Sequence, residues 1–134
     1  MLHAFRHPVT SWLLLVGYCL LIFIQSSQPS IDMGTDLPGM DKLLHLAAYS
    51  FMAVLACRAF ATLPRLNSAL ALFLAGFAFT LLFGLSDEWH QSFVPARMAD
   101  VWDFAADGLG ALLGGGFASR RLCATESQDA TFPR

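Results

Sequence analysis

Charged residues are scarce in this sequence, and their scarcity excludes an ordinary soluble domain. Only 13% of the 134 residues are Asp, Glu, Lys or Arg, whereas 56% are hydrophobic. A small soluble protein has a large surface for its volume and needs charged side chains to cover it. The composition therefore indicates a membrane protein whose surface is covered largely by lipid.

A basic surface and a cysteine framework are also missing. The net charge of −2 offers no basic stripe that could neutralise phosphates, so we expect no nucleic-acid partner. The cysteines show no Cys-x-x-Cys spacing: Cys19 and Cys57 lie inside apolar runs, and Cys123 lies in a polar tail. We expect two small buried side chains and one tail thiol, without a disulfide framework.

Four hydrophobic segments account for most of the chain. A bilayer core about 30 Å thick needs about 20 largely apolar helical residues to span it. Breaks that are rich in proline, glycine and polar residues separate the segments. The sequence predicts an all-α polytopic membrane protein with four transmembrane helices, at about residues 9–27, 41–62, 66–89 and 100–119.

We expect these helices to form one domain, residues 1–121, in an up-down-up-down bundle. Residues 122–134 are polar and are expected to form a disordered cytoplasmic tail. The first segment is not expected to be cleaved, because residues 25–29 do not resemble a small-x-small signal-peptide site. Lys and Arg near the helix ends gather on one side, which predicts that both termini are cytoplasmic. That side holds Arg6, Arg58, Arg65, Arg120 and Arg121, and the other holds Lys42 and Arg97.

The other polar residues gather at the predicted outer ends of the helices. Residues three or four apart share one face of a helix. Such sets are Asp41, His45 and Tyr49 on the second segment and Asp100, Asp103 and Asp107 on the fourth. A carboxylate about 10 Å below a helix start costs about 2 to 3 kcal/mol in lipid, so it must face the bundle interior or a water-filled pocket. We therefore expect one polar cup that opens to the outer surface.

Several residues of this cup are candidates for chemistry. A partly buried carboxylate beside an imidazole can be tuned towards neutral pH, and an arginine can clamp a phosphate or carboxylate. The catalytic candidates are Glu88, His90, His45 and Asp87. The binding candidates are Arg97, Gln91, Lys42, Asp41, Tyr49, Ser26, Ser27, Asp103 and Asp107. Their spacing matches no metal-binding motif, so we predict no metal site, and the sequence identifies no cofactor.

Several candidates also have a structural interpretation. Asp41 and Lys42 can form an interfacial ion pair, and Ser27, like Ser26, can bond a carbonyl at a helix end. Asp107 and His45 can be hydrogen-bonded interior residues. If these interpretations hold, the cluster is a structural network rather than a site.

The glycines of the fourth segment indicate close helix packing. Gly110-x-x-x-Gly114 places two small residues on one helix face, which lets another helix approach. The same pair offers a surface for helix–helix self-association. A structural subunit of a larger membrane complex would depend on this surface above all.

These motifs together resemble the VanZ-like family. The resemblance extends from about Trp12 to Gly115, in the right order and on the expected helices. One departure is Asp107, where many members look to have Asn. The residues that carry the resemblance are Gln25-Ser26-Ser27-Gln28-Pro29, Asp41-Lys42-Leu43-Leu44-His45 with Tyr49, Ser86-Asp87-Glu88-Trp89-His90-Gln91-Ser92-Phe93-Val94-Pro95-Ala96-Arg97, and Asp100 through Asp103 to Asp107-Gly108-Leu109-Gly110.

The resemblance implies a multi-pass protein of the bacterial cytoplasmic membrane, but it implies no agreed reaction. The family is named for an accessory protein of glycopeptide-resistance clusters that is associated with low-level resistance to teicoplanin. Most members lie outside such clusters, so resistance is not assumed here.

Three functions remain open at this point. The first is an enzyme that acts on a lipid, isoprenoid or cell-wall precursor head group at the outer surface. The second is a protein that binds or shields such a lipid-linked molecule without chemistry, and the third is a structural or assembly subunit. A transporter is disfavoured, because the polar residues reach only one side and no paired broken helices are visible.

Overall fold

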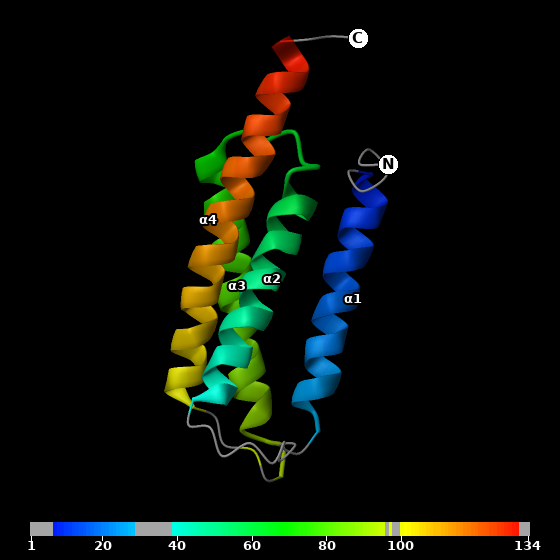
Figure 1. Ribbon diagram of the computed structural model, residues 1–134. Coiled ribbons are helices and arrows are strands. Elements are labelled where there is room, and N and C mark those ends of the chain that lie inside the picture. Colours follow the sequence, from blue (N-terminus) through cyan, green and yellow to red (C-terminus); the bar gives the residue numbers. More distant parts are fainter. Residues whose placement is uncertain (1–6, 29–38, 96, 98–99, 132–134) are drawn as a thin grey trace.

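The computed structural model describes residues 7–28, 39–95, 97 and 100–131, with side chains as far as residue 125. The described residues form four α-helices and no strand: α1 (Pro8–Ser26), α2 (Met40–Phe60), α3 (Ala69–Gln91) and α4 (Val101–Thr131). The predicted all-helical fold is therefore confirmed (Figure 1).

Three of these helices are long and apolar enough to cross a membrane: α1, α2 and α3. Their composition confirms three of the four predicted spans as candidates. The fourth predicted span, α4, is less apolar than the other three helices, because Asp103, Asp107 and several glycines interrupt its hydrophobic run.

Local sequence signals account for most helix starts. Pro8 is the first residue of α1, where its missing N–H costs no hydrogen bond. The hydroxyl of Ser68 caps α3 by accepting a hydrogen bond from the backbone N–H of Ala71 at 3.2 Å, so α3 begins three residues later than predicted. Gly39 precedes α2 with a φ of 84°, a conformation that suits glycine.

The fourth helix is longer than predicted. We expected a disordered tail from residue 122, but α4 continues to Thr131 and extends past the other helices at the upper end of Figure 1. Residues 118–126 include Ala, Arg, Leu and Glu, which favour helix and so permit this extension. The last three residues of the predicted tail lie outside the described part of the chain.

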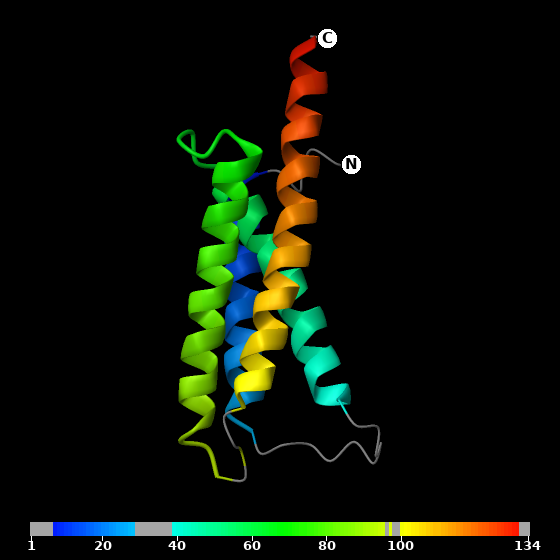
Figure 2. The same ribbon diagram turned by 90° about the vertical axis from the view of Figure 1, so that its left-hand side faces the viewer.

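The second helix lies at the centre of the bundle. It contacts α1, α3 and α4, and its contact with α4 is the most extensive of the molecule. A hydrophobic core joins it to α1: Leu15, Ile22, Tyr49, Met52, Leu55, Ala56 and Ala59. Figure 2 shows α4 crossing α2 at an angle.

Glycines allow α4 and α2 to approach each other closely. A Cβ at Gly110 would collide with the carbonyl oxygen of Leu46, and a Cβ at Gly114 would collide with the carbonyl oxygen of Ser50. The Ser50 hydroxyl donates a hydrogen bond to the Gly110 carbonyl oxygen at 2.9 Å across this contact. The surface predicted for self-association through Gly110 and Gly114 is thus filled by α2 of the same chain, since the small residues serve packing within the bundle.

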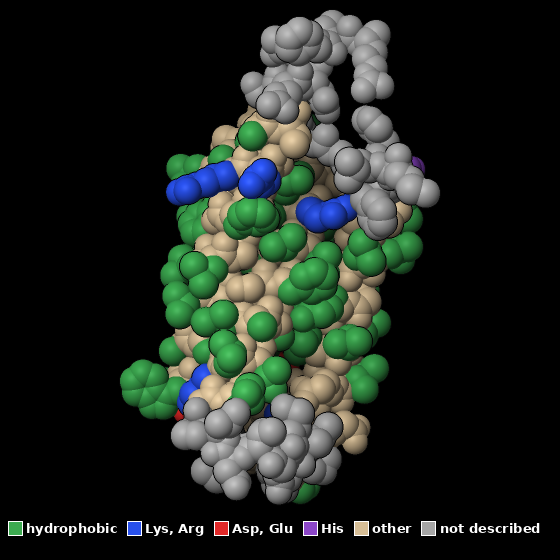
Figure 3. All heavy atoms as spheres, in the orientation of Figure 1, with side chains coloured by type: hydrophobic (Ala, Val, Ile, Leu, Met, Phe, Trp, Pro, Cys, Tyr) green, Lys and Arg blue, Asp and Glu red, His purple; other side chains and the backbone are tan. Residues whose placement is uncertain are grey.

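The middle of the molecule exposes a belt of large apolar side chains. Figure 3 shows hydrophobic side chains over the middle of one face, with Lys and Arg near its two ends. Exposed examples come from all parts of the bundle, including Leu13, Phe51, Leu74, Leu82 and Phe117. Such a surface suits lipid and not water, and it agrees with a membrane protein.

Candidate functional site

The candidate site lies at the lower end of the bundle in Figure 1, where α1 and α3 end and α2 and α4 begin. We name it the polar cup. Hydrogen bonds between side chains far apart in the sequence connect these four helix ends. The polar cup consists of Ser26, Ser27, Asp41, Lys42, His45, Tyr49, Asp87, Glu88, His90, Gln91, Arg97, Asp100, Asp103 and Asp107.

A lysine and three carboxylates form the rim of the polar cup, where Asp41 is exposed and the other three residues are half-buried. Lys42 Nζ donates to Asp41 Oδ2 and Asp100 Oδ2, both at 2.8 Å, and to Asp103 Oδ1 at 2.9 Å. The predicted pair of Asp41 and Lys42 therefore forms an ion pair, and two carboxylates of the α4 end join it. This rim ties the start of α2 to the start of α4.

Asp100 is a rim residue whose ionisation is favoured by Lys42. The hydrogen bond from the ammonium group, together with the backbone N–H of Trp102, holds the pKa of the Asp100 carboxyl below its ordinary range. Asp100 was predicted on the polar face of the fourth segment but not among the site residues. Its role becomes visible only when α2 and α4 are side by side.

Below the rim, His45 joins Asp107. His45 Nδ1 lies 2.9 Å from Asp107 Oδ1, and His45 Nε2 lies 3.9 Å from Asp103 Oδ2. Asp107 is fully buried, so the structure places it in the bundle interior as its depth required. Gly84 on α3 makes room for it: a Cβ there would lie 3.0 Å from Asp107 Oδ2. No signal in the sequence pointed to this role of Gly84.

A second chain of hydrogen bonds runs through α3. The Tyr49 hydroxyl donates to Asp87 Oδ2 at 2.9 Å, and Gln91 Nε2 donates to the same oxygen at 3.0 Å. Arg97 Nη1 donates in turn to Gln91 Oε1 at 3.3 Å. The predicted residues Tyr49, Asp87, Gln91 and Arg97 are thus brought together in one network.

Arg97 also connects α3 to the end of α1. Its guanidinium donates to the carbonyl oxygens of Gln25 and Gln28, at 3.2 and 3.0 Å. Among the described residues, every hydrogen-bond partner of Arg97 is a neutral oxygen, and no carboxylate pairs with it. Its positive charge therefore has no anionic partner within the described part of the chain.

The two acid/base candidates of α3 point to different neighbours. Glu88 Oε2 accepts a hydrogen bond from the backbone N–H of Asp100 at 3.0 Å. His90 lies beside α1, where its Nε2 is 3.0 Å from the Ser27 hydroxyl and its ring stacks on Phe23. The structure places Glu88 near His45 rather than pairing it with His90, because alternate residues of a helix face different sides.

The serines at the end of α1 have separate surroundings. Ser26 is buried, whereas Ser27 is half-buried. The Ser27 hydroxyl donates to the carbonyl oxygen of Phe23 at 2.7 Å, which is the helix-end bond expected of such a serine. Ser27 therefore combines a structural bond with its contact to His90.

Three buried carboxylates of the polar cup have an oxygen without a hydrogen-bond partner among the described residues. These oxygens are Asp87 Oδ1, Glu88 Oε1 and Asp107 Oδ2. The exposed fractions of the three residues are 4%, 7% and 0%. Native structures rarely leave buried carboxylate oxygens unsatisfied, so each of these three oxygens needs a physical explanation.

Two groups of side chains in the polar cup are close enough together to hold a cation. In each group, one ligand atom per residue lies within 4.8 Å of the others: His45, Glu88 and Asp107 form the first, and Asp41, Asp100 and Asp103 the second. The second group already surrounds the Lys42 ammonium. The spacing of these residues in the sequence did not predict either group, because each draws on more than one helix.

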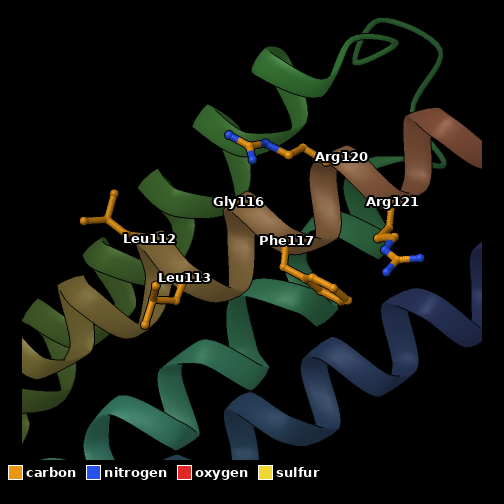
Figure 4. Close-up of a pocket in the computed structure, with 6 residues that line it drawn as sticks. All are labelled: Leu112, Leu113, Gly116, Phe117, Arg120 and Arg121. Atoms are coloured by element: carbon orange, nitrogen blue, oxygen red, sulfur yellow. The ribbon is translucent and has the colours of Figure 1, made fainter.

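A shallow hollow lies along α4, away from the polar cup. Its volume is about 460 Å³, and Leu112, Leu113, Gly116, Phe117, Arg120 and Arg121 line it (Figure 4). Arg121 lies 5.4 Å from the centre of the Phe117 ring. This hollow contains none of the predicted site residues.

Comparison with known proteins gave one match. The family model described as VanZ/LLP1 matches residues 5–122, which cover most of the chain and all of the polar cup. Neither the search of curated proteins nor the search of solved structures returned a match.

Proposed function

The chain belongs to the VanZ/LLP1 family, and from this membership we propose that it is a multi-pass protein of the bacterial cytoplasmic membrane whose polar cup binds or modifies a lipid-linked or cell-wall-related molecule. The polar cup faces outward, towards the compartment in which cell-wall precursors are displayed. Both termini are cytoplasmic, and the four helices run up-down-up-down.

The distribution of arginines supports this orientation. Arg58, Arg65, Arg120 and Arg121 belong to the end of the bundle opposite the polar cup, whereas Lys42 and Arg97 belong to the cup end. An excess of Lys and Arg marks the cytoplasmic side. The fourth helix serves as a span because its carboxylates turn inward to α2, while Leu109, Leu112 and Phe117 are exposed to lipid.

One observation carries the proposal: three buried carboxylate oxygens lack partners among the described residues, at the end of an otherwise apolar bundle. Leaving a buried polar group unsatisfied costs about 1–3 kcal/mol, and more for a charged one. A structural hydrogen-bond network has no reason to keep this cost, whereas a ligand-binding site does.

Arg97 provides the chemistry for recognising an anionic head group. It is half-buried at the mouth of the polar cup, and its described partners are neutral oxygens. Guanidinium groups bind phosphate and carboxylate through two parallel hydrogen bonds. A lipid with a phosphate head group can place its chain along the exposed apolar surface of α1 while its phosphate reaches Arg97.

Glu88 and His45 are the residues best placed for proton transfer to or from such a ligand. A modification reaction would use them as general acid and base, since the two side chains share the interior of the cup. A binding protein would use the same groups only as hydrogen-bond partners. A structural subunit was expected to contact its complex through Gly110 and Gly114. These glycines are already packed against α2 of the same chain, which disfavours that alternative.

Native mass spectrometry of the detergent-purified protein tests the proposal. A polyprenyl phosphate is titrated against the wild type, and the corresponding polyprenyl alcohol serves as the ligand without the anion. We expect the phosphate to bind at least about tenfold more tightly than the alcohol, which corresponds to one charge-assisted contact. Arg97→Gln should remove this preference, whereas Arg120→Gln, at the other end of the bundle, should keep it.

Equal binding of phosphate and alcohol by the wild type would overturn the proposal. So would an Arg97→Gln protein that keeps the preference. An effect on glycopeptide susceptibility belongs to the same proposal: expression of the chain should change the teicoplanin concentration that inhibits a sensitive host. Arg97→Gln should lose that change while remaining in the membrane.

A further inference from the structure

Three side chains from three helices converge in the interior of the polar cup. His45 from α2, Glu88 from α3 and Asp107 from α4 each offer a ligand atom within 4.8 Å of the other two. Glu88 is 7% exposed and Asp107 is fully buried. From this convergence, we propose that His45, Glu88 and Asp107 bind one divalent transition-metal cation.

The unsatisfied oxygens are an independent observation that supports a cation. Glu88 Oε1 and Asp107 Oδ2 are buried and have no hydrogen-bond partner among the described residues. The other oxygen of each group is used: Glu88 Oε2 accepts from the Asp100 N–H, and Asp107 Oδ1 lies 2.9 Å from His45 Nδ1. Each carboxylate thus keeps one oxygen for positioning and one oxygen available for a ligand.

Charge points to the same conclusion. The polar cup holds six carboxylates but only two cationic side chains, Lys42 and Arg97. Lys42 is engaged at the rim, and Arg97 is bonded to neutral oxygens. With neutral histidines, an excess of four negative charges remains, and a divalent cation would offset half of it. Buried carboxylates are normally paired or coordinate metals.

The second acidic group of the cup provides an internal comparison. Asp41, Asp100 and Asp103 also lie within ligand distance of one another, but the Lys42 ammonium sits among them. That group has a cation of its own and, among the described residues, no unpartnered buried oxygen. Apart from His45 itself, the described residues provide no cationic side chain to the inner group of His45, Glu88 and Asp107.

The donor set selects the class of cation. Imidazole favours transition metals, whereas carboxylates alone favour Mg²⁺ and Ca²⁺. One imidazole with two carboxylates suits Mn²⁺ or Zn²⁺, and three protein ligands leave positions for water or a ligand oxygen. The inference goes beyond the proposed function, because a cation can bind whether or not a lipid does.

Electron paramagnetic resonance tests the site with Mn²⁺, which gives a sharp signal in water that is lost on binding. The full chain is purified in detergent, stripped with a chelator and titrated with Mn²⁺. We expect one equivalent to bind to the wild type, with Zn²⁺ competing for the same site. His45→Ala and Glu88→Gln should each weaken Mn²⁺ binding by at least about 100-fold. Loss of a residue that only hydrogen-bonds to a metal ligand already weakens binding by up to about 100-fold, and these two variants remove a ligand itself.

Glu126→Gln is the matched control for Glu88→Gln. It removes a carboxylate by the same substitution near the far end of α4, so it should bind one equivalent like the wild type. Thermal unfolding without metal shows whether each variant is folded: Glu88→Gln should be as stable as the metal-free wild type or more so, because it removes a buried charge.

A wild-type protein that binds no Mn²⁺ and no Zn²⁺ would overturn the inference, as would folded variants that bind like the wild type. The polyprenyl phosphate titration, repeated on the chelator-treated protein, separates this failure from failure of the proposed function. Lipid binding without metal binding refutes only the metal site. Metal binding without lipid binding refutes only the lipid ligand.

Discussion

Tyr49 shows how the bundle supports a buried carboxylate. Its hydroxyl donates to Asp87 at 2.9 Å, and both residues are almost fully buried. Tyr49→Phe keeps the ring but removes the hydroxyl. Among the described residues, only Gln91 then donates a hydrogen bond to the Asp87 side chain. We expect a loss of about 1–3 kcal/mol in the free energy of unfolding, because a buried carboxylate loses one of its two described hydrogen-bond donors.

Tyr18→Phe is the control for this prediction. The Tyr18 hydroxyl donates to the carbonyl oxygen of Ala48 at 3.1 Å in a half-buried position, so its loss should cost about 0.5–1.5 kcal/mol. Chemical unfolding of both variants in detergent, followed by circular dichroism, measures the difference. An equal loss in the two variants would mean that Asp87 does not depend on Tyr49.

The ionisation of Asp100 should make the stability of the fold depend on pH. Its carboxyl pKa is lower in the folded protein than in the unfolded chain because Lys42 hydrogen-bonds the ionised form. A lowered pKa stabilises the fold above the unfolded pKa, near about 4, and the contribution is lost as the pH falls through the lower folded pKa. Asp100→Asn lacks this contribution at every pH.

Thermal unfolding over the range from neutral to strongly acidic pH tests this expectation. The wild type should be more stable than Asp100→Asn at neutral pH, and the difference should shrink below about pH 4. Glu126→Gln, remote from Lys42 in the fold, should differ little from the wild type throughout. A constant difference between wild type and Asp100→Asn would show that the pairing with Lys42 contributes nothing through ionisation.

At the same scale, the sequence predicted which polar residues lie at the same end of the bundle, but not which of their side chains contact each other. Depth and charge required Asp107 to turn inward, and the structure places it there. Glu88 and His90 are both catalytic candidates two residues apart in the sequence, but His90 contacts Ser27 and Phe23. The imidazole near Glu88 is that of His45, which comes from another helix, and no spacing within one chain segment reveals such a contact.

At the scale of elements, the contact of α2 with α4 depends on two glycines. A Cβ at Gly114 would collide with backbone atoms of Ser50, which cannot rotate away. Gly114→Ala should therefore push the helices apart and cost about 1–3 kcal/mol or more, as overpacking does. Gly116 lies two residues further along the same helix, and a Cβ added there would have nothing within 4 Å.

Gly116→Ala is thus a matched control, because it adds the same methyl group to the same helix. It should stabilise the protein by about 0.5–1 kcal/mol, because alanine favours a helix over glycine. Denaturant unfolding of the two variants gives opposite signs if the packing argument holds. A neutral Gly114→Ala would show that the two helices can separate freely at this point.

The elements themselves were largely predictable, for a clear physical reason. Long apolar runs between turn residues identified α1, α2 and α3. The end of α4 was not predictable in the same way, because residues after 121 are polar and only their moderate helix propensity extends the helix to Thr131. The role of Gly84 was invisible for another reason: it exists only where α3 meets Asp107.

At the scale of the whole molecule, polarity is divided between two ends and a belt. The carboxylates of the polar cup, His45 and His90 lie at one end of the bundle, and Arg58, Arg65, Arg120 and Arg121 belong to the other. Apolar side chains cover the middle of the face seen in Figure 3. This division suits the transmembrane arrangement that we propose. The polar cup can then face either the outside or the cytoplasm. The excess of arginines at the opposite end favours a polar cup that faces outward.

Cysteine labelling in intact cells tests this orientation. Cys123 lies on α4 beyond the arginine-rich end, so a membrane-impermeant maleimide should label it only after the cells are permeabilised. In a Cys123→Ser background, Ser92→Cys should react in intact cells, because Ser92 is exposed at the cup end of α3. Cys19 and Cys57 lie within candidate spans and should stay unlabelled in both proteins. The reverse pattern, with Cys123 labelled in intact cells and the Ser92→Cys protein protected, would place the polar cup in the cytoplasm, where it could meet only ligands of the inner leaflet.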